Sequence, residues 1–220
     1  MGCVGDLEDN QTYGWIDNWE YNMRGKEKVP YSERYEEISK HIKGKNVTLL
    51  DVGCRDGILR KYLDNSVKYY GIDIEPKADF VQKVDVTVDR FPFKSNFFDY
   101  VVISEVLEHL DNQRHCLNEI YRVLKPEGIL IGTVPNSLRA NRIIMTFFNK
   151  RFRMTEDHYY SFDIDEIERL LKANRFDIIE LYTFHFKLPK IGEMKIFEKL
   201  FPRFCVYIFF KAVKRRIGET

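Results

Sequence analysis

A β-rich run, NVTLLDV at residues 46–52, leads directly into a turn that contains Gly53 and Gly57. The run is too short for a buried helix, while the next residues, ILRKYLDN at 58–65, carry apolar side chains at helical spacing. The sequence therefore predicts a strand, a glycine turn and a helix in immediate succession.

The same alternation of strand and helix signals continues along the chain. Further β-rich runs lie at residues 68–74, 80–86, 98–104, 128–134, 176–184 and 204–213. Helices are predicted at 31–42 with Ser32 as N-cap, at 112–124 before KPEG, and at 161–174, where Asp163 and Glu166 suit a capping box. This alternation predicts an α/β fold built on a doubly wound parallel sheet.

Size and composition favour a single domain in a reducing compartment. The 220 residues suffice for one α/β domain, and no Pro-, Gly- or Ser-rich linker divides them. Lys plus Arg (35) nearly equals Asp plus Glu (34), so no overall field favours nucleic acid or membrane. The four cysteines, Cys3, Cys54, Cys116 and Cys205, lie too far apart for a zinc motif or a disulfide framework. Without a signal peptide or an apolar run of membrane-spanning length, the expected location is the cytoplasm.

Candidate binding residues follow the predicted strands, because ligands of open α/β sheets bind beyond the carboxyl ends of the strands. Asp51, Asp73, Asp85 and Ser104 occupy such positions. Asp73 lies about twenty residues after the glycine turn, where a carboxylate can accept hydrogen bonds from both hydroxyls of a ribose. Asp85 is placed to accept from an exocyclic adenine amine. Together they describe an adenosine site; the alternative is that these aspartates cap loops or helices.

The glycine spacing indicates which class of adenosine cofactor the turn can bind. A dinucleotide-binding turn requires G-x-G-x-x-G so that a helix N-terminus approaches a pyrophosphate. Counted from Gly53, that pattern would need glycine at Arg55 and Ile58. No G-x-x-x-x-G-K-[ST] phosphate loop occurs either. The turn therefore suits a ligand that approaches the backbone without phosphates.

In order and spacing, residues 47–136 resemble the class I S-adenosylmethionine-dependent methyltransferases, and are similar to type 11-like enzymes of the quinone-biosynthesis O-methyltransferase branch. LLDVGCRDG (49–57) resembles the first motif, YYGIDIEP (69–76) the second with its ribose-binding acid, and residues 84–110 and 119–136 the middle of the family. The resemblance implies a Rossmann-like sheet of seven strands whose last strand, from 204–213, is antiparallel. It also implies that S-adenosylmethionine is contacted by Asp51, Gly53, Arg55, Gly57, Asp73, Ile74, Asp85, Val86 and Ser104.

Arg55 departs from this pattern, since the family usually has a glycine there. Beside Asp56, the Arg55 side chain is placed to reach the methionine carboxylate of the cofactor, or an anionic group of the substrate, through a charge-assisted hydrogen bond. The alternative is a side chain that faces solvent or pairs with Asp56.

The stretch EVLEHL, residues 105–110, carries the candidate chemistry. Methyl transfer depends mainly on alignment, so a base is needed only for a nucleophile of high pKa. The E-x-x-E-H pattern of Glu105, Glu108 and His109 resembles the metal-binding motif of polyprenyl dihydroxybenzoate and small-RNA O-methyltransferases, which implies a divalent ion such as Mg²⁺. His158 lies at a place comparable to a further histidine of the RNA enzymes. The alternatives are that His109 and His158 are metal-free bases or substrate contacts, or that the stretch serves capping and packing.

Two segments, 137–160 and 187–203, combine basic residues with aromatic and aliphatic ones. We expect them to cover the acceptor site beside a cofactor-binding core at 46–136, with 1–45 as an N-terminal helical segment. They favour O-methylation of a small-molecule, lipid-like or glycan acceptor, with peripheral membrane contact; packing on the core or a homodimer contact is the alternative. The near-neutral net charge disfavours nucleic acid as the substrate. Two alternative functions stay open: an RNA methyltransferase, and a non-catalytic regulatory protein that binds S-adenosylmethionine.

Overall fold

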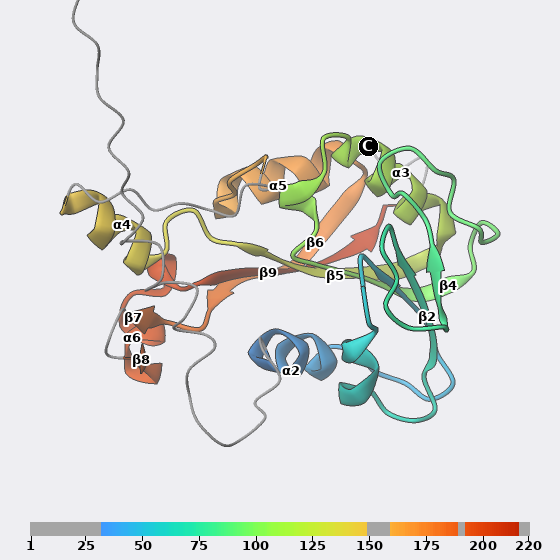
Figure 1. Cartoon of the computed structure of the whole chain (residues 1–220), viewed down its shortest axis with the longest axis horizontal. Helices are drawn as coiled ribbons and strands as arrows, with labels where there is room; N and C mark the ends of the chain where they lie inside the picture. Colours follow the sequence, from blue (N-terminus) through green and yellow to red (C-terminus); the bar gives the residue numbers. More distant parts are fainter. Residues whose placement is uncertain (1–31, 149–158, 189–191, 216–220) are drawn as a thin grey trace, which may run out of the picture. The chain divides into compact units, whose positions relative to one another are not determined.

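The computed structural model describes residues 32–148, 159–188 and 192–215. Its main feature is a seven-stranded sheet in the order β3-β2-β1-β4-β5-β9-β6 (Figure 1). The strands are β1 Thr48–Val52, β2 Lys68–Asp73, β3 Val81–Lys83, β4 Phe98–Ser104, β5 Leu124–Pro135, β6 Phe176–Phe184 and β9 Tyr207–Lys214.

Strands β1 to β5 pair in parallel, whereas β9 pairs antiparallel with both β5 and β6. The predicted Rossmann-like, doubly wound sheet with an antiparallel last strand is thereby confirmed. Because β9 is antiparallel to both of its neighbours, β6 runs in the same direction as β5. The carboxyl ends of β1, β2, β4, β5 and β6 therefore lie along one edge of the sheet, where ligands bind in such folds.

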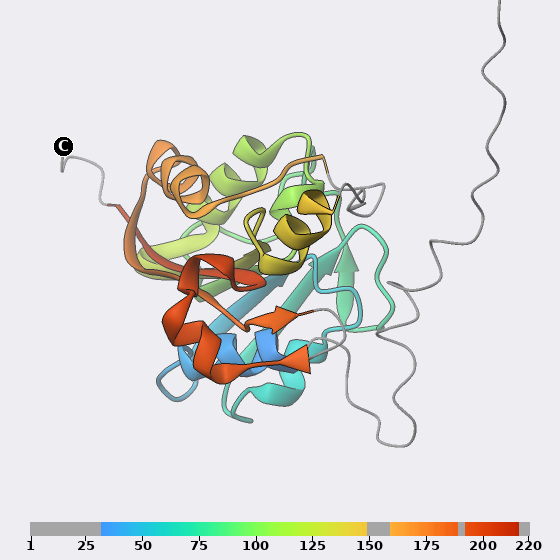
Figure 2. The ribbon, with the colours of Figure 1, turned by 90° about the vertical axis from the view of Figure 1, so that its left-hand side faces the viewer.

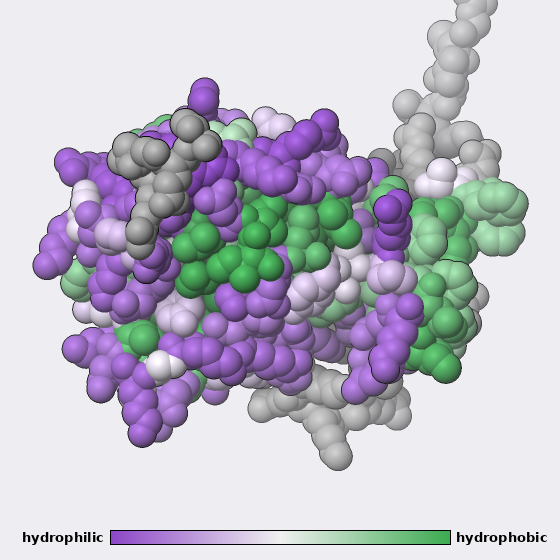
Figure 3. All heavy atoms as spheres, turned by 180° about the vertical axis from the view of Figure 1, so that it is seen from behind, coloured by the Kyte–Doolittle hydropathy of each residue, from purple (hydrophilic) through white to green (hydrophobic). Residues whose placement is uncertain are grey.

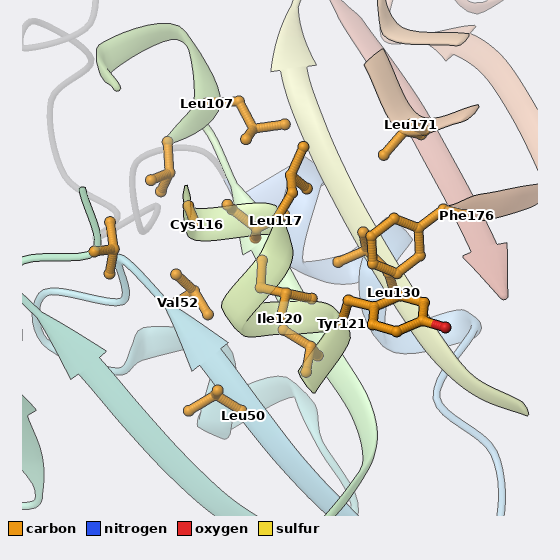
Figure 4. Close-up of a cluster of buried hydrophobic side chains, with 14 of the residues drawn as sticks. Leu50, Val52, Leu107, Cys116, Leu117, Ile120, Tyr121, Leu130, Leu171 and Phe176 are labelled. Atoms are coloured by element: carbon orange, nitrogen blue, oxygen red, sulfur yellow. The ribbon is translucent and has the colours of Figure 1, made fainter. Parts of the chain in front are cut away.

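Helices cover both faces of the sheet, with α3 (Gln113–Val123) and α5 (Ile164–Ala173) on one face and α2 (Ser32–Lys40) on the other (Figure 1). Alternation along β1 explains the two layers. Leu50 and Val52 pack against α3 residues such as Leu117 and Ile120 (Figure 4). Leu49 points to the opposite face and joins a cluster with Ile38 of α2. Alternate residues of a strand face opposite sides of a sheet, so one apolar run supplies both cores.

Local capping fixes the starts of α3 and α5, and the capping box of α5 was predicted from the sequence, whereas Ser32, the predicted N-cap, is the first residue of α2. The Asn112 side chain accepts a hydrogen bond from the His115 backbone N–H at 3.2 Å at the start of α3. At the start of α5, Asp163 and Glu166 form the reciprocal pair of a capping box, at 2.8 and 2.9 Å. Such bonds satisfy N–H groups that have no partner within the helix.

Three elements differ from the prediction. The expected helix at 58–65 is a short 3₁₀ helix, η1 Ile58–Tyr62, which buries only Leu59 and so lacks the apolar stripe that would sustain an α-helix. The expected strand 80–86 shortens to β3, because Asp85 turns the chain through bonds to Thr87. The KPEG stretch lies inside β5 as an irregularity, where Glu127 has a φ of 61°.

The two predicted substrate-side segments lie at the same end of the sheet (Figures 1 and 2). The described elements of these segments are α4 Ala140–Phe147, the hairpin of β7 (Lys187–Leu188) and β8 (Gly192–Glu193), α6 Lys195–Leu200 and η3 Pro202–Phe204. Ala140 of α4 packs in one cluster with Phe186 and Cys205. The chain from Glu33 onward forms one compact unit. Among the described residues, every helix is too short or too polar to cross a bilayer.

Candidate functional site

The glycine turn after β1 contains three residues with left-handed backbone, Gly53, Arg55 and Gly57, at φ 70°, 51° and 69°. A Cβ at Gly53 would lie 2.4 Å from Val106 Cγ2, and one at Gly57 would lie 2.6 Å from Phe80 Cε2. Gly53 therefore requires glycine for conformation and for space, whereas Gly57 requires it for conformation, because the Phe80 ring is 46% exposed. Arg55 adopts the same backbone region with a side chain attached, at the position where the resemblance to the family implied glycine.

Asp73, at the end of β2, is held by that turn. Its Oδ2 accepts a hydrogen bond from the Arg55 backbone N–H at 2.8 Å, and its Oδ1 accepts one from the Glu75 N–H at 2.7 Å. A carboxylate oxygen has two acceptor sites, so each oxygen retains one for a ribose hydroxyl. The predicted ribose acid is thus aimed by two backbone donors, and the left-handed backbone of Arg55 supplies one of them.

The Arg55 side chain is exposed, and the contacts that fix this position are made by its backbone N–H to Asp73 and by its carbonyl, which accepts from Lys77 N at 2.8 Å. We therefore expect Arg55→Gly, which retains both backbone groups, to leave affinity for S-adenosylmethionine within about twofold of wild type at every salt concentration. Calorimetric titration across a salt series measures this. A salt-dependent loss of affinity would instead show that the guanidinium contacts an anionic group of the cofactor.

Asp51 is the buried acid of the site. It lies in β1 and is 5% exposed, and the Tyr69 hydroxyl donates to its Oδ2 at 2.7 Å. Burial raises the pKa of Asp51 from 3.8 to about 7, the Tyr69 hydrogen bond opposes this shift, and the negative charges of Asp73 and Asp56 add to it. A buried carboxyl with such a pKa favours a cationic neighbour, because a positive charge stabilises its ionised form.

This pKa predicts a pH dependence of cofactor binding. About 9% of Asp51 is ionised at pH 6 and about half at pH 7, so an ammonium group that binds the ionised form should gain roughly fivefold in affinity over that interval. Calorimetry at the two pH values measures the gain, and Asp51→Asn, which leaves the titration of the ligand unchanged, should abolish it. An equal gain of affinity in Asp51→Asn would contradict the assignment.

The raised pKa of Asp51 also affects folding. The stability that Asp51 contributes is greatest below its ordinary pKa and is lost as the pH rises through about 7.

The other predicted cofactor contacts, Asp85, Val86 and Ile74, differ in hydrogen bonding and in burial. Asp85 Oδ1 accepts from the Thr87 backbone N–H at 2.9 Å and from the Thr87 hydroxyl at 2.6 Å, and these bonds lower the pKa of Asp85. The carboxylate therefore caps its own turn, the structural role that the sequence left open. Val86 is buried in the main core, so it can meet a ligand only through its backbone, whereas Ile74 is 54% exposed next to Asp73.

Ser104, the last residue of β4, and Glu105, the next residue, belong to one polar network. The hydroxyls of Ser104 and Thr133 are 2.8 Å apart, and Thr133 donates to Glu105 Oε1 at 3.2 Å. Glu105 Oε2 lies 3.5 Å from Nη1 of Arg34, which extends from α2 and is itself buried. The guanidinium of Arg34 also lies 5.6 Å from the ring centre of Tyr207. Glu105 is therefore engaged in an ion pair that fixes α2 to the ligand edge of the sheet.

Arg34 is not among the site residues predicted from the sequence. A usable signal was present, because Arg34 lies four residues before Ile38 and hence on the face of α2 that packs against the sheet. A charged residue on an apolar helix face indicates a buried partner.

Glu108 and His109 lie in a 3₁₀ turn, η2 Leu107–His109, rather than on an α-helix. Glu108 is 1% exposed, and its carbonyl accepts from the N–H groups of Tyr159 and Tyr160. His109 Nε2 is 3.9 Å from Glu108 Oε1, and the His109 side chain is partly exposed. His158 lies outside the described residues.

The predicted metal donors do not form a compact set in the described part of the chain. The three-donor cluster whose ligand atoms all lie within 4.8 Å of one another consists of His185, Glu193 and Glu198, and does not include Glu105, Glu108 or His109. A metal at the latter three residues stays a prediction.

Comparisons with known proteins identify the family of the chain. A family model described as a methyltransferase domain matches residues 23–181. An uncharacterised protein of Methanocaldococcus jannaschii is 28% identical over 206 residues, covering 80% of this chain and 79% of the relative. The ubiquinone biosynthesis O-methyltransferase of Rickettsia typhi is 24% identical over 191 residues, covering 79% of this chain and 75% of that enzyme. The human mitochondrial arginine-hydroxylase NDUFAF5 is 34% identical over 95 residues, and this chain spans only 28% of its length.

The solved structures carry the same fold. A crystal structure from Thermotoga maritima, described as that of an S-adenosylmethionine-dependent methyltransferase, superimposes with a TM-score of 0.61 at 16% identity, covering 83% of this chain and 89% of that one. S-adenosylmethionine fits the residues of the site, since Asp73 at the glycine turn offers ribose acceptors and Asp51 offers a buried negative charge. The chain belongs to the methyltransferase domain family and is an S-adenosylmethionine-dependent methyltransferase.

Proposed function

We propose that the enzyme methylates an oxygen of a small, lipid-like acceptor. The observation that carries this proposal is an apolar surface formed by α4, α6 and the residues that follow each helix, beside the ligand edge of the sheet. Phe147 is 85% exposed. The other exposed apolar side chains of this surface are Ile143, Ile144, Phe148, Ile196, Leu200, Phe201 and Phe204. Figure 3 shows apolar atoms at this end of the molecule, at the right of the view.

The segment after α6 is hydrogen-bonded to the residue that follows β5. Asn136 directly follows β5, and its side-chain amide donates to the carbonyls of Arg203 and Cys205 at 2.9 and 2.8 Å. Its backbone N–H donates to the carbonyl of Val206 at 2.9 Å. The apolar surface thus begins where β5 ends and β9 begins, on the half of the sheet away from Asp73. Exposed apolar side chains gathered at one end of the molecule favour an apolar ligand or partner.

The similarity to the Rickettsia typhi ubiquinone biosynthesis O-methyltransferase supports an oxygen nucleophile. That similarity extends over most of both chains, so it includes the segments beyond the cofactor-binding core. A partly exposed imidazole near the edge is consistent with a hydroxyl acceptor, since a hydroxyl of high pKa needs a base.

In this mechanism the chain binds and aligns, and one histidine moves a proton. The bound cofactor supplies a methyl group activated by its sulfonium. Asp73 and the glycine turn orient the nucleoside end, Asp51 holds the cationic end, and the α4–α6 surface places the acceptor. His109 takes the proton from the acceptor hydroxyl at a ring nitrogen. Alignment of this kind supplies much of the rate of a two-substrate reaction.

His109→Gln therefore has a defined expected effect. Loss of a general base lowers kcat by about 10²–10⁴-fold, while the affinity for S-adenosylmethionine stays unchanged because the cofactor contacts are elsewhere. Steady-state kinetics with both substrates, beside a calorimetric titration of the cofactor, test this. A variant that keeps the wild-type kcat would leave catalysis to alignment alone.

The acceptor class is tested by following conversion of the methyl donor with phenols, lipids in vesicles, glycans and RNA, with and without Mg²⁺. We expect turnover on apolar phenols or lipids. The product should carry one additional methyl group, bound to oxygen. Turnover on RNA alone would favour the second candidate, and cofactor binding without any turnover would indicate a regulatory role. Exposed Lys195, Lys199 and Arg203 lie among the apolar residues of α6 and η3. Binding of the protein to vesicles of anionic lipid therefore tests peripheral membrane contact.

A further inference from the structure

A second cluster of chemically competent side chains lies on the acceptor side of the sheet. His185 directly follows β6, Glu193 ends β8, and Glu198 lies on α6. Their ligand atoms all lie within 4.8 Å of one another. None of the three belongs to the cofactor site or to the EVLEHL stretch, so the function described above does not account for them.

His185 is placed by packing. It is 8% exposed and stacks on Tyr207 of β9 with ring centres 5.9 Å apart and planes inclined by 29°. The Val206 N–H donates to its carbonyl at 3.0 Å, which fixes its backbone against the start of β9. The imidazole is therefore held in a nearly solvent-free position, with its ring directed by the stack.

The two carboxylates reach this imidazole from different segments. His185 Nδ1 lies 3.8 Å from Glu193 Oε1, which is too long for a hydrogen bond. Glu198 Oε1 accepts from the Phe186 backbone N–H at 3.2 Å, so its direction is set by a residue next to His185. Two ligands about 2.1 Å from one tetrahedral ion stand about 3.4 Å apart, so small side-chain rotations would bring these donors into coordination.

We propose that His185, Glu193 and Glu198 bind a divalent transition-metal ion, with Zn²⁺ as the best-matched probe. One imidazole and two carboxylates form a donor set that suits Zn²⁺, whereas Mg²⁺ prefers oxygen ligands alone. Three protein ligands leave a coordination position for water. The ion joins the residue after β6, the β7–β8 hairpin and α6, and so fastens the segment that carries the acceptor surface. The cluster is separate from the metal site predicted at Glu105, Glu108 and His109.

The test is competition of the full-length protein with a chromophoric Zn²⁺ indicator, followed by thermal unfolding with and without Zn²⁺. Wild type should bind one Zn²⁺ and gain thermal stability. Glu193→Gln keeps the shape of the side chain and should weaken Zn²⁺ binding by about 100-fold or more, since loss of even an outer-shell partner costs 10–100-fold. His185→Phe preserves a ring against Tyr207 without the ligand nitrogen, and should lose binding while retaining the unfolding temperature measured without metal.

Glu168→Gln is the matched control, because Glu168 on α5 is 39% exposed and Glu193 is 42% exposed. It should bind Zn²⁺ as wild type does. Equal Zn²⁺ affinity in wild type and Glu193→Gln would overturn the proposal, as would a loss of binding in Glu105→Gln that Glu193→Gln does not share. Neither measurement depends on the acceptor, so the result is independent of the proposed methylation.

Discussion

Replacement of Asp73 by alanine should weaken binding of S-adenosylmethionine by at least about 100-fold. The carboxylate offers an acceptor to each ribose hydroxyl, and a hydrogen bond to a charged group contributes about 1.5–3 kcal/mol. Two such bonds exceed the roughly 2.7 kcal/mol that a 100-fold change in Kd represents. The substitution also removes the acceptor for the N–H groups of Arg55 and Glu75, so the turn loses its anchor. Calorimetric titration measures the effect.

Asp79→Ala serves as the control, because Asp79 is an exposed acid in the loop after β2 and its removal changes the net charge equally. Its affinity should match wild type. Asp73→Asn should fall between the two, since an amide keeps one acceptor oxygen but directs its NH₂ group toward a backbone donor. Unchanged affinity in Asp73→Ala, with Asp79→Ala also unchanged, would remove Asp73 from the cofactor site.

Gly53→Ala should destabilise the protein by about 2–5 kcal/mol. Left-handed backbone costs a non-glycine residue about 1–2 kcal/mol, and an overpacked contact adds about 1–3 kcal/mol. The contact is severe because the new Cβ would lie 2.4 Å from Val106 Cγ2. For a domain of this size the unfolding temperature should fall by roughly 10 °C. Displacement of the turn should also abolish cofactor binding.

A double-mutant cycle with Val106→Ala separates the two causes. Val106→Ala deletes both Cγ atoms and leaves Val106 Cβ at 3.4 Å, an ordinary contact distance. Gly53→Ala should therefore cost about 1–3 kcal/mol less in the Val106→Ala background, with only the backbone penalty remaining. The same cost in both backgrounds would show that Val106 does not restrict this position.

Patterns within a few residues predicted much of this molecule. Alternation of β-rich runs and helices located the seven strands, and Asp163 with Glu166 located the start of α5, because these signals act within one turn or one strand. The end of β2 likewise identified Asp73, since strand order places strand ends at a common edge. The resemblance supplied the antiparallel direction of β9, which no local pattern contains.

Features that depend on packing between distant segments were not predictable in this way. The pairing of Arg34 with Glu105, and the approach of His185 to Glu198, require the sheet to bring separate segments together. The left-handed backbone of Arg55 was also hidden, because arginine gives no local signal for positive φ. The α-helix expected at 58–65 shows the opposite case. Its local pattern favoured a helix, but the segment packs too little of its surface against the rest of the protein to stabilise one.

The position of β9 has a consequence for how the chain folds as it is synthesised. Its partners are β5 and β6, yet it follows both in the sequence, and β6 contacts the sheet only through it. Until residues 207–214 leave the ribosome, β6 has no place in the sheet and both β5 and β6 present unpaired edges. We expect a nascent chain that stops before residue 207 to display protease-sensitive β6 and to engage chaperones, and release of the next eight residues to complete the sheet in one cooperative step.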